Sequence, residues 1–413
     1  MSVPFRYNFR SIFYRKTTTA LTLLAIALTV CVTTIMVSVQ QGFSGSAGRT
    51  GSPRNIIAMR AGATSEGESS ISLEDAQKIA GLPEVARDAD GAPVAVPEVF
   101  TGVYLKREGS AGGTNISMRG TAPRALEMRL GGKIDAGRMF QLGKRECIVG
   151  RGLVGRIENC RLGGVIRILD EDWPVVGVFS TGGSVYEAEI WADGEVVRQV
   201  FERPGWSTVF FTAAPSVDVG AEAKTTAPRQ GDYKAILAAM KIDPPTGLIA
   251  RLKSSEFRLL ARSERQYFID QAGFMGLIIQ GLATMLAVMM SFGAVFGCTN
   301  TLLASVAGRT REIGSLLAMG FTARAVRLGF LFEALAIGLL GGLIGILLAL
   351  PVHGMATGTF SFGSFSEATF KFEITPLGVA VSMGLAAFIG VLGGVVPAVR
   401  ASRLKPVEAL RGE

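Results

Sequence analysis

The 413-residue chain is apolar and basic: 48% of its residues are hydrophobic, 18% are charged, and its net charge is +8. A charged share below about a quarter is unusual for a soluble domain and indicates that part of the chain lies in lipid. Residues 40–270 hold 29 Lys and Arg against 28 Asp and Glu, so the basic excess lies beside the apolar segments outside this range. This distribution argues against a nucleic-acid-binding protein, which would carry a basic face on a folded domain.

The first apolar segment, residues 17–39, contains no charged residue. As a helix it would measure about 35 Å, enough to cross a hydrocarbon core of roughly 30 Å. A cleaved signal peptide is the alternative, because Ser44 to Ala47 could imitate a cleavage region. The apolar run is longer than the roughly 7–15 residues of a signal-peptide core, so we expect a retained transmembrane helix.

Three further membrane spans are predicted, at residues 271–304, 328–352 and 376–399. Of the 13 Lys and Arg outside residues 40–270, 12 fall in the N-terminal segment, the loop between the second and third spans, and the C-terminal tail. Four spans place these segments on one side, which the positive-inside rule makes cytoplasmic. We therefore expect a multi-pass inner-membrane protein with both termini in the cytoplasm. The cytoplasmic segments are 1–16, 305–327 and 400–413, and the extracytoplasmic ones are 40–270 and 353–375.

The large extracytoplasmic segment has the patterning of a mixed α/β domain. Strands are predicted at 55–60, 94–105, 114–119, 145–149, 165–169, 173–179 and 187–192, and helices at 72–80, 152–157, 233–240 and 254–270. The first of these helices has a capping signal, because Ser72 precedes it and Asp75 follows three residues later. The expected fold is four transmembrane α-helices, one plus three, with this domain inserted between the first and second.

Two of the four cysteines, Cys147 and Cys160, lie in the predicted extracytoplasmic domain. An oxidising compartment would permit a disulfide between them. Two separate buried thiols are the other interpretation, because the sequence does not show whether their Cα atoms come close enough for a bond.

The chain offers little for catalysis of its own. His353 is its only histidine, which nearly excludes histidine-dependent catalysis and histidine-rich metal sites. The Gly-Lys pairs at 132–133 and 143–144 lack the Ser or Thr that follows in a phosphate-binding loop. We therefore expect no metal, no cofactor and no ATP bound by this chain.

Small residues recur at four-residue spacing in the predicted spans, which lets helix backbones approach closely in lipid. In the third span Gly338 and Gly342 interleave with Gly341 and Gly345, although general glycine richness would also produce such pairs. Glu333 is the only charge inside a span, and an intramembrane carboxylate is a functional candidate by default. Its position near the cytoplasmic end favours the plainer interpretation, a carboxylate that pairs with a nearby arginine.

The loop between the second and third spans carries the most specific motif of the chain. Its apolar residues form a short stripe and a glycine ends it, so we expect a brief amphipathic helix; a helix lying on lipid headgroups would also explain the pattern. The motif consists of Arg309, Thr310, Arg311, Glu312, Ile313, Gly314, Ser315, Leu316, Leu317, Ala318, Met319, Gly320 and Phe321.

This loop resembles, almost residue for residue, the coupling helix of the MacB/FtsX family of ABC-transporter permeases, also called mechanotransmission or type VII transporters. The tail from Pro397 to Arg411 is similar to the ending of that family, and the order of one span, a large domain and three spans is the family's arrangement. The resemblance is strong over residues 270–413 and moderate over 1–60 and 130–195. The short segment before the first span is similar to separate-subunit permeases, of the lipoprotein-releasing or DevC-like kind.

The resemblance implies a non-catalytic subunit that couples ATP hydrolysis by a separate cytoplasmic ATPase to movements of its extracytoplasmic domain. These movements would export or extract a lipid, lipoprotein or peptide-like substrate. The implied coupling residues are Arg309, Thr310, Arg311, Glu312, Ile313, Gly314, Leu316, Leu317 and Met319. The implied partners are the ABC ATPase, a second copy or a paralogous permease, the lipid bilayer and, in some systems, a periplasmic adaptor or outer-membrane channel. An FtsX-like regulator that transports nothing and a membrane-tethered enzyme are the alternatives.

Overall fold

The computed structural model describes residues 16–63, 65–219, 247–253, 259–361 and 366–404. They form two compact units. The first, here called the helical unit, comprises residues 1–42, 277–355 and 372–413; the second, the sheet unit, comprises residues 43–276 and 356–371. Two helices, α2 and α8, contribute residues to both units.

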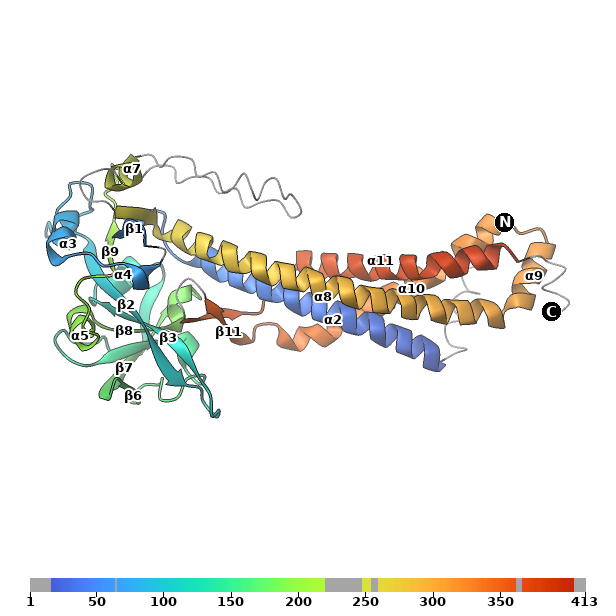
Figure 1. Ribbon diagram of the computed structural model, residues 1–413, viewed down its shortest axis with the longest axis horizontal. Helices are drawn as coiled ribbons and strands as arrows, with labels where there is room; N and C mark the ends of the chain where they lie inside the picture. Colours follow the sequence, from blue (N-terminus) through green and yellow to red (C-terminus); the bar gives the residue numbers. More distant parts are fainter. Residues whose placement is uncertain (1–15, 64, 220–246, 254–258, 362–365, 405–413) are drawn as a thin grey trace. The chain divides into compact units, whose positions relative to one another are not determined.

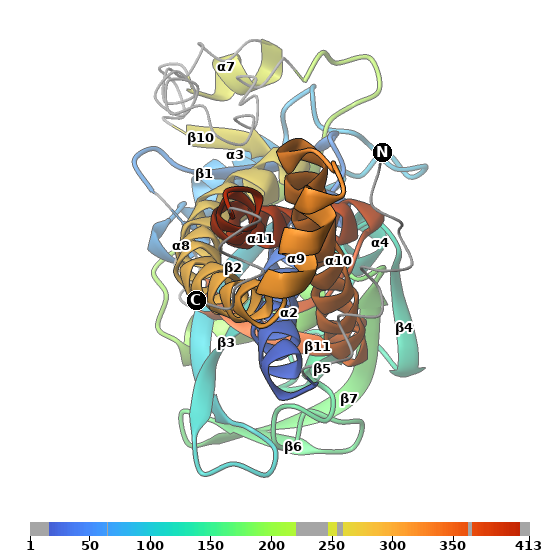
Figure 2. The same ribbon diagram turned by 90° about the vertical axis from the view of Figure 1, so that its right-hand side faces the viewer.

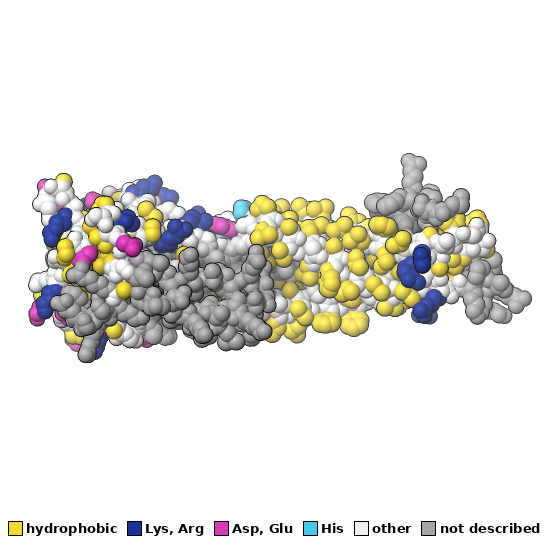
Figure 3. Space-filling view, turned by 90° about the horizontal axis from the view of Figure 1, so that it is seen from above, with side chains coloured by type: hydrophobic (Ala, Val, Ile, Leu, Met, Phe, Trp, Pro, Cys, Tyr) yellow, Lys and Arg dark blue, Asp and Glu magenta, His cyan; other side chains and the backbone are white. Residues whose placement is uncertain are grey.

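Four described helices are long and apolar enough to cross a membrane, and they run side by side in the helical unit (Figures 1 and 2). They are α2 (Lys16–Arg49), α8 (Glu264–Gly308), α10 (Ala323–Ala349) and α11 (Pro376–Ser402). A short helix, α9 (Thr310–Ala318), connects α8 to α10, and the 3-10 turn η4 (Leu350–Val352) follows α10. Apolar side chains cover much of the unit's visible surface (Figure 3). The predicted fold of four membrane-spanning helices, one plus three, is confirmed.

The helix predicted at 254–270 is wrong for residues 259–263, which form strand β10 (Leu259–Ser263). Buried and half-buried side chains alternate along this strand, and it pairs antiparallel with β1. Helix α8 begins only at Glu264, because Ser263 Oγ accepts a hydrogen bond from the backbone N–H of Gln266 at 3.3 Å and caps the helix. Residues 254–258 lie outside the described residues. From Glu264 the 45-residue helix runs without interruption, about 68 Å at 1.5 Å per residue.

The sheet unit is built on a ten-stranded sheet in the order β10-β1-β9-β2-β3-β8-β5-β7-β4, with β6 paired to β7 (Figure 1). Neighbouring strands are antiparallel except β3 with β8 and β5 with β7. The strands are β1 (Asn55–Arg60), β2 (Ala95–Lys106), β3 (Gly113–Thr121), β4 (Gly132–Gly137), β5 (Cys147–Gly150), β6 (Val165–Ile168), β7 (Glu171–Thr181), β8 (Glu189–Asp193), β9 (Thr208–Thr212) and β10. All seven predicted strands are present, so the mixed α/β class is confirmed.

Short helices and turns complete the sheet unit. They are η1 (Glu66–Glu68), α3 (Leu73–Ala80), α4 (Ala125–Met128), η2 (Arg151–Leu153), η3 (Val185–Ala188), α5 (Gly194–Val200) and α7 (Gly247–Lys253). The predicted cap of α3 is confirmed, because Ser72 Oγ accepts from the backbone N–H of Asp75 at 3.0 Å. The helix predicted at 152–157 is wrong: only the single turn η2 forms there, since Gly155 has a φ of +75° that a helix cannot contain. The helix predicted at 233–240 lies outside the described residues.

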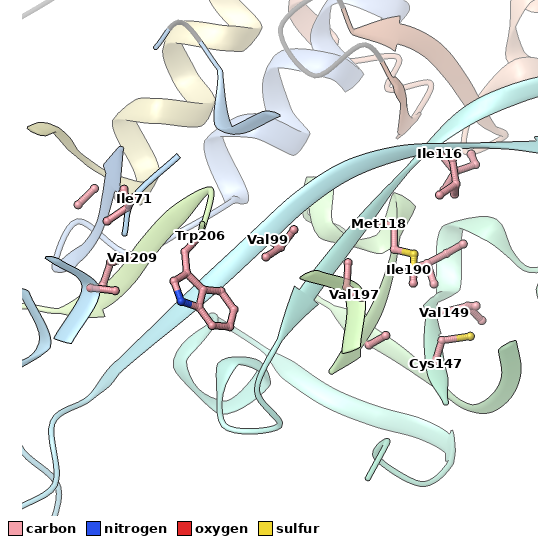
Figure 4. Close-up of a cluster of buried hydrophobic side chains, with 14 of the residues drawn as sticks. Ile71, Val99, Ile116, Met118, Cys147, Val149, Ile190, Val197, Trp206 and Val209 are labelled. Atoms are coloured by element: carbon pink, nitrogen blue, oxygen red, sulfur yellow. The ribbon is translucent and has the colours of Figure 1, made fainter. Parts of the chain in front are cut away.

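The core of the sheet unit is an apolar cluster with members on strands from β10 to β7, and Figure 4 shows part of it. Trp206, Val99 and Met118 are among its labelled members, and Ile190 and Val149 extend it along neighbouring strands. A hairpin that the sequence did not predict, β11 (Ala356–Ser361) with β12 (Ser366–Lys371), belongs to the same unit.

Candidate coupling site

The α9 segment is a short α-helix of nine residues that ends at a glycine. Gly320 has a φ of +91°, a conformation that glycine adopts without strain. Its N–H bonds the carbonyl of Leu317 at 3.1 Å, and the N–H of Phe321 bonds the carbonyl of Leu316 at 3.2 Å. This pair of bonds is the Schellman ending, which satisfies carbonyls that a helix terminus leaves free. The predicted short helix that ends at Gly320 is therefore present.

One face of α9 is anchored on the ends of three membrane-spanning helices. Ile313 is 3% exposed and Gly314 is buried, while Leu317 packs beside them. Their apolar cluster contains Val306 of α8, Val326 and Phe330 of α10, and Ala398 and Ala401 of α11. A displacement of α9 therefore has to displace these helix ends or break the cluster.

The opposite face of α9 is open. Arg311 and Glu312 are exposed, and Met319, just past the last turn, is 66% exposed. Thr310 and Leu316 are half-buried between the two faces. The motif thus divides into an apolar anchor and a charged outer face with an apolar tip, which is a composition suited to a protein partner.

Arg309 joins α9 to the buried carboxylate of α10. Its Nε lies 3.1 Å from a carboxylate oxygen of Glu312, and its Nη1 lies 3.6 Å from one of Glu333, which is 5% exposed. The guanidinium also stands 5.9 Å from the ring centre of Phe330. Glu333 is thus held by an arginine at the edge of the helical unit, which agrees with the plainer of the two interpretations. Its partner comes from the preceding loop rather than from its own helix.

The interleaved glycines of α10 face two different helices. A Cβ built on Gly338 would lie 2.6 Å from the carbonyl oxygen of Ala386 and 3.0 Å from Cα of Gly390, both in α11. One on Gly345 would lie 2.5 Å from the carbonyl oxygen of Ala27 in α2. Gly342 behaves like Gly338, with Ala386 and Met383 as neighbours, and Gly341 faces Ile26 and Leu23 of α2. The helix α10 therefore packs closely against α11 through Gly338 and Gly342 and against α2 through Gly341 and Gly345.

Hydroxyl pairs add polar contacts between α2 and two other membrane-spanning helices. Thr22 and Thr301 Oγ1 atoms lie 2.5 Å apart and link α2 to α8, and Thr34 Oγ1 donates to Ser382 Oγ of α11 at 2.9 Å. Such bonds contribute on the order of 1 kcal/mol each in a membrane. Sequence spacing did not single out these residues.

Cys147 and Cys160 are free thiols in the structure, so the disulfide that the sequence left open is not formed. Cys147 lies in β5 with its Sγ 3.6 Å from the carbonyl oxygen of Pro174. Burial raises the pKa of both thiols, that of Cys160 to about 12, so neither ionises readily at neutral pH.

The sheet unit contains a buried charge cluster that the sequence did not reveal. Arg119 of β3 is 1% exposed and donates to the carboxylates of Glu66, Glu98 and Glu189 at 2.8–3.0 Å. Arg129 donates two further 2.9 Å bonds to Glu98. Alternation gave no signal for this cluster, because Arg119 lies on the opposite phase of its strand from Ile116 and Met118, which belong to the apolar core.

Comparison with known families supplies the decisive observation. Residues 19–226 match the MacB-like periplasmic core domain, and residues 284–406 match the FtsX-like permease C-terminal family. The chain belongs to the MacB/FtsX family of ABC transporter permeases. The second match includes α9, α10 and α11, so the anchor of α9 lies within the family's permease region.

The permease is also similar to individual relatives. It is 35% identical over 132 residues to the macrolide export ATP-binding/permease protein MacB of Bdellovibrio bacteriovorus, covering 32% of this chain and 19% of the relative. It is 32% identical over 190 residues to the MacB protein of Chlorobaculum tepidum, covering 44% and 28%. The aligned part therefore spans a fifth to about a quarter of these relatives. The periplasmic region of MacB from Actinobacillus actinomycetemcomitans matches 53% of this chain and 92% of that structure, with 10% identity and a TM-score of 0.35.

Proposed function

We propose that this permease couples ATP hydrolysis by a separate cytoplasmic ABC ATPase, which binds the nucleotide, to movement of its sheet unit. The observation that carries the proposal is the division of α9 into a face buried against three helix ends and an exposed face with Arg311, Glu312 and Met319. A partner that pushes on the exposed face acts directly on the membrane-spanning helices. The named relatives combine ATP binding and a permease in one protein, which supports an ATPase as that partner.

The path of the motion follows the contacts of α10. The Arg309–Glu333 ion pair joins the start of α9 to α10, and the apolar cluster around Ile313 joins it to α11. From α10, the tight glycine contacts carry a displacement to α2 and α11, since backbones this close have no room to slide independently. The helical unit would then act as a two-state element that responds to the nucleotide state of the partner.

The sheet unit would do the work on the extracytoplasmic side, in the export or extraction of a lipid, lipoprotein or peptide-like substrate. An FtsX-like regulator of an extracytoplasmic enzyme is the second candidate, favoured by the C-terminal family match. The two functions differ in what stimulates the ATPase of the reconstituted complex. A lipid, lipoprotein or peptide should accelerate hydrolysis if the protein is a transporter, and only a hydrolase should do so if it is a regulator.

Reversing the two exposed charges of α9 should abolish ATPase binding. In the double variant Arg311→Glu, Glu312→Arg the exposed face presents the opposite charge pattern and loses the Arg309–Glu312 ion pair, while the residues of the apolar anchor around Ile313 are unchanged. We expect at least a roughly tenfold loss of the ABC ATPase that co-purifies with the tagged chain, because like charges at a contact cost several kcal/mol. Arg324→Glu, another exposed charge reversal near the start of α10, is the control and should retain the ATPase. If the double variant co-purifies with as much ATPase as the wild type, the exposed face of α9 is not the contact site.

A second copy of the chain is proposed to pack on α8. Of the apolar stretch of α8, 6% of the residues are buried within the chain, against 33–39% in the other three membrane-spanning helices. Gly293 and Gly297 of α8 also have open space where a Cβ would stand, whereas the four α10 glycines described above are in close contact with other helices. We expect the pair of changes Gly293→Leu and Gly297→Leu to shift the purified protein from dimer to monomer in mass measurements in nanodiscs. Gly384→Leu on α11, also in open space, is the control; an unchanged dimer in the α8 variant would exclude this face.

A further inference from the structure

The side chain of Glu264, the first residue of α8, is fully buried and makes three hydrogen bonds within the sheet unit. One carboxylate oxygen accepts from the backbone N–H of Ser52 at 2.9 Å and from Asn55 Nδ2 at 2.8 Å. The other accepts from the hydroxyl of Tyr186 at 2.8 Å. A buried carboxylate is costly unless its oxygens are paired, and here three donors and the helix N-terminus satisfy it.

The three donors come from two parts of the chain, the connection from α2 to β1 and the turn η3. Ser52 follows the end of α2 at Arg49, Asn55 opens strand β1, and Tyr186 lies in η3. The approach is close: a Cβ on Gly51, whose φ is +84°, would lie 2.6 Å from Cγ of Glu264. One carboxylate therefore joins the end of α2, the start of α8 and the sheet.

Tyr186 extends this junction into the buried charge cluster. The guanidinium of Arg129 stands 4.4 Å from the centre of the Tyr186 ring, and Arg129 donates to Glu98 of β2. Phe268, one turn after Glu264 on the same face of α8, packs edge-on against Tyr186 with ring centres 5.2 Å apart. The junction thus contacts the buried charge cluster of the sheet unit and does not lie on its surface.

We propose that Glu264 is the positioning residue that locks the ends of α2 and α8 to the sheet, so that a displacement of either helix moves the sheet and the other helix with it. Only α2 and α8 among the described helices contribute residues to both units, so a motion carried along either of these two helices into the sheet unit passes this junction. A carboxylate suits this site because both of its oxygens are charged acceptors, which strengthens the bonds from all three donors. The inference deepens the proposed function, but its structural test does not depend on an ATPase.

The test is hydrogen exchange of the full chain in lipid nanodiscs, without nucleotide, comparing wild type with Glu264→Gln. The amide keeps the shape but replaces a charged acceptor with a neutral one, and its NH2 group must face either the Tyr186 hydroxyl or the Ser52 and Asn55 donors, so the three bonds are weakened or lost. We expect backbone amides of residues 44–52 and of residues 266–273 both to exchange at least about tenfold faster, while those of β3 and β8 stay at wild-type rates. Tyr186→Phe, which removes a single donor, should produce a smaller change in the same two segments. Glu195→Gln, an exposed carboxylate of α5, is the control.

Three results would overturn the proposal. Faster exchange of 266–273 alone would mean that Glu264 merely caps its own helix, and unchanged exchange of both segments would mean that the carboxylate locks nothing. Faster exchange throughout the sheet would mean that its role is general stability. Failure of the proposed function looks different: the wild-type complex with its ATPase would then show no nucleotide-dependent exchange in these segments, while the effect of Glu264→Gln would persist.

Discussion

The variant Arg119→Met is expected to lower the free energy of unfolding of the sheet unit by about 3–5 kcal/mol, because removing one partner of a buried ion pair leaves uncompensated charge. Arg119 makes five hydrogen bonds to three carboxylates, and methionine replaces its bulk but none of its donors. Arg129 can still neutralise Glu98, whereas Glu66 and Glu189 each lose their guanidinium partner.

The chain carries its own probe for this measurement. Its three tryptophans, Trp173, Trp191 and Trp206, all lie in the sheet unit, so the fluorescence change on denaturation reports this unit in the intact protein. The matched control is Arg145→Met, whose partner Glu171 and own side chain are both about half exposed. An exposed pair contributes about 0–1 kcal/mol, so the control should stay near wild type. Equal losses of unfolding free energy in Arg119→Met and Arg145→Met would show that the buried cluster stabilises the sheet unit no more than an exposed ion pair does.

The loss in Arg119→Met should depend on pH with a definite sign. Burial already raises the pKa of Glu66 in the intact protein, against the attraction of Arg119. Without that arginine the pKa should rise further, so the folded state binds a proton more tightly than the unfolded state does. Stability gained this way is present at low pH and is lost as pH rises through the folded pKa. The deficit relative to wild type should therefore be smaller near pH 5 than at pH 7.5, and a deficit independent of pH would contradict this explanation.

The wild type should show the opposite trend in acid. For Glu98, burial favours a higher pKa, but Arg129 and Arg119 outweigh it and the pKa is lowered. Such a group contributes stability above its unfolded pKa and loses it as pH falls through the folded value. Acid titration of the same fluorescence transition checks this sign.

The variant Gly338→Leu is expected to disrupt the contact of α10 with α11. Even its Cβ would overlap the backbone of α11 at Ala386 and Gly390, and backbone cannot move aside as a flexible side chain can. Overpacking of this kind costs typically about 1–3 kcal/mol, and a leucine extends well beyond Cβ. We expect a lower melting temperature of the detergent-purified protein and loss of ATP-linked activity in the complex.

The control for this change is Gly384→Leu on α11, where nothing lies within 4 Å of a built Cβ. Leucine is a better helix former than glycine by nearly 1 kcal/mol, so this variant should be as stable as wild type or slightly more stable. Gly338→Ala should fall between the two leucine variants. If Gly338→Leu has the same melting temperature as Gly384→Leu, the glycine spacing in α10 is a result of the high glycine content of the chain and is not needed for helix packing.

Local pattern was enough for much of the fold. Charge-free runs longer than a bilayer predict spans, and the apolar stripe before Gly320 predicts α9. Alternation predicts seven strands, and the cap at Ser72 predicts α3. The start of α8 was also encoded locally, by Ser263 and Gln266 at capping-box spacing; the long charged stretch around it suggested an amphipathic helix instead.

The sequence by itself predicts which segments enter the membrane and which side carries the basic loops, and it identifies the loop that carries the family motif. These predictions depend on the hydrophobicity and charge of short segments, in which residues close in sequence are also close in space. Only the tertiary structure decided that Gly338 faces α11 while Gly345 faces α2, and that Arg119 meets Glu189, 70 residues away. It also brought Glu264 to Ser52 across 212 residues. Contacts between residues this far apart in sequence depend on how whole helices and strands pack together. The residue spacing within a single helix or strand carries no information about that packing.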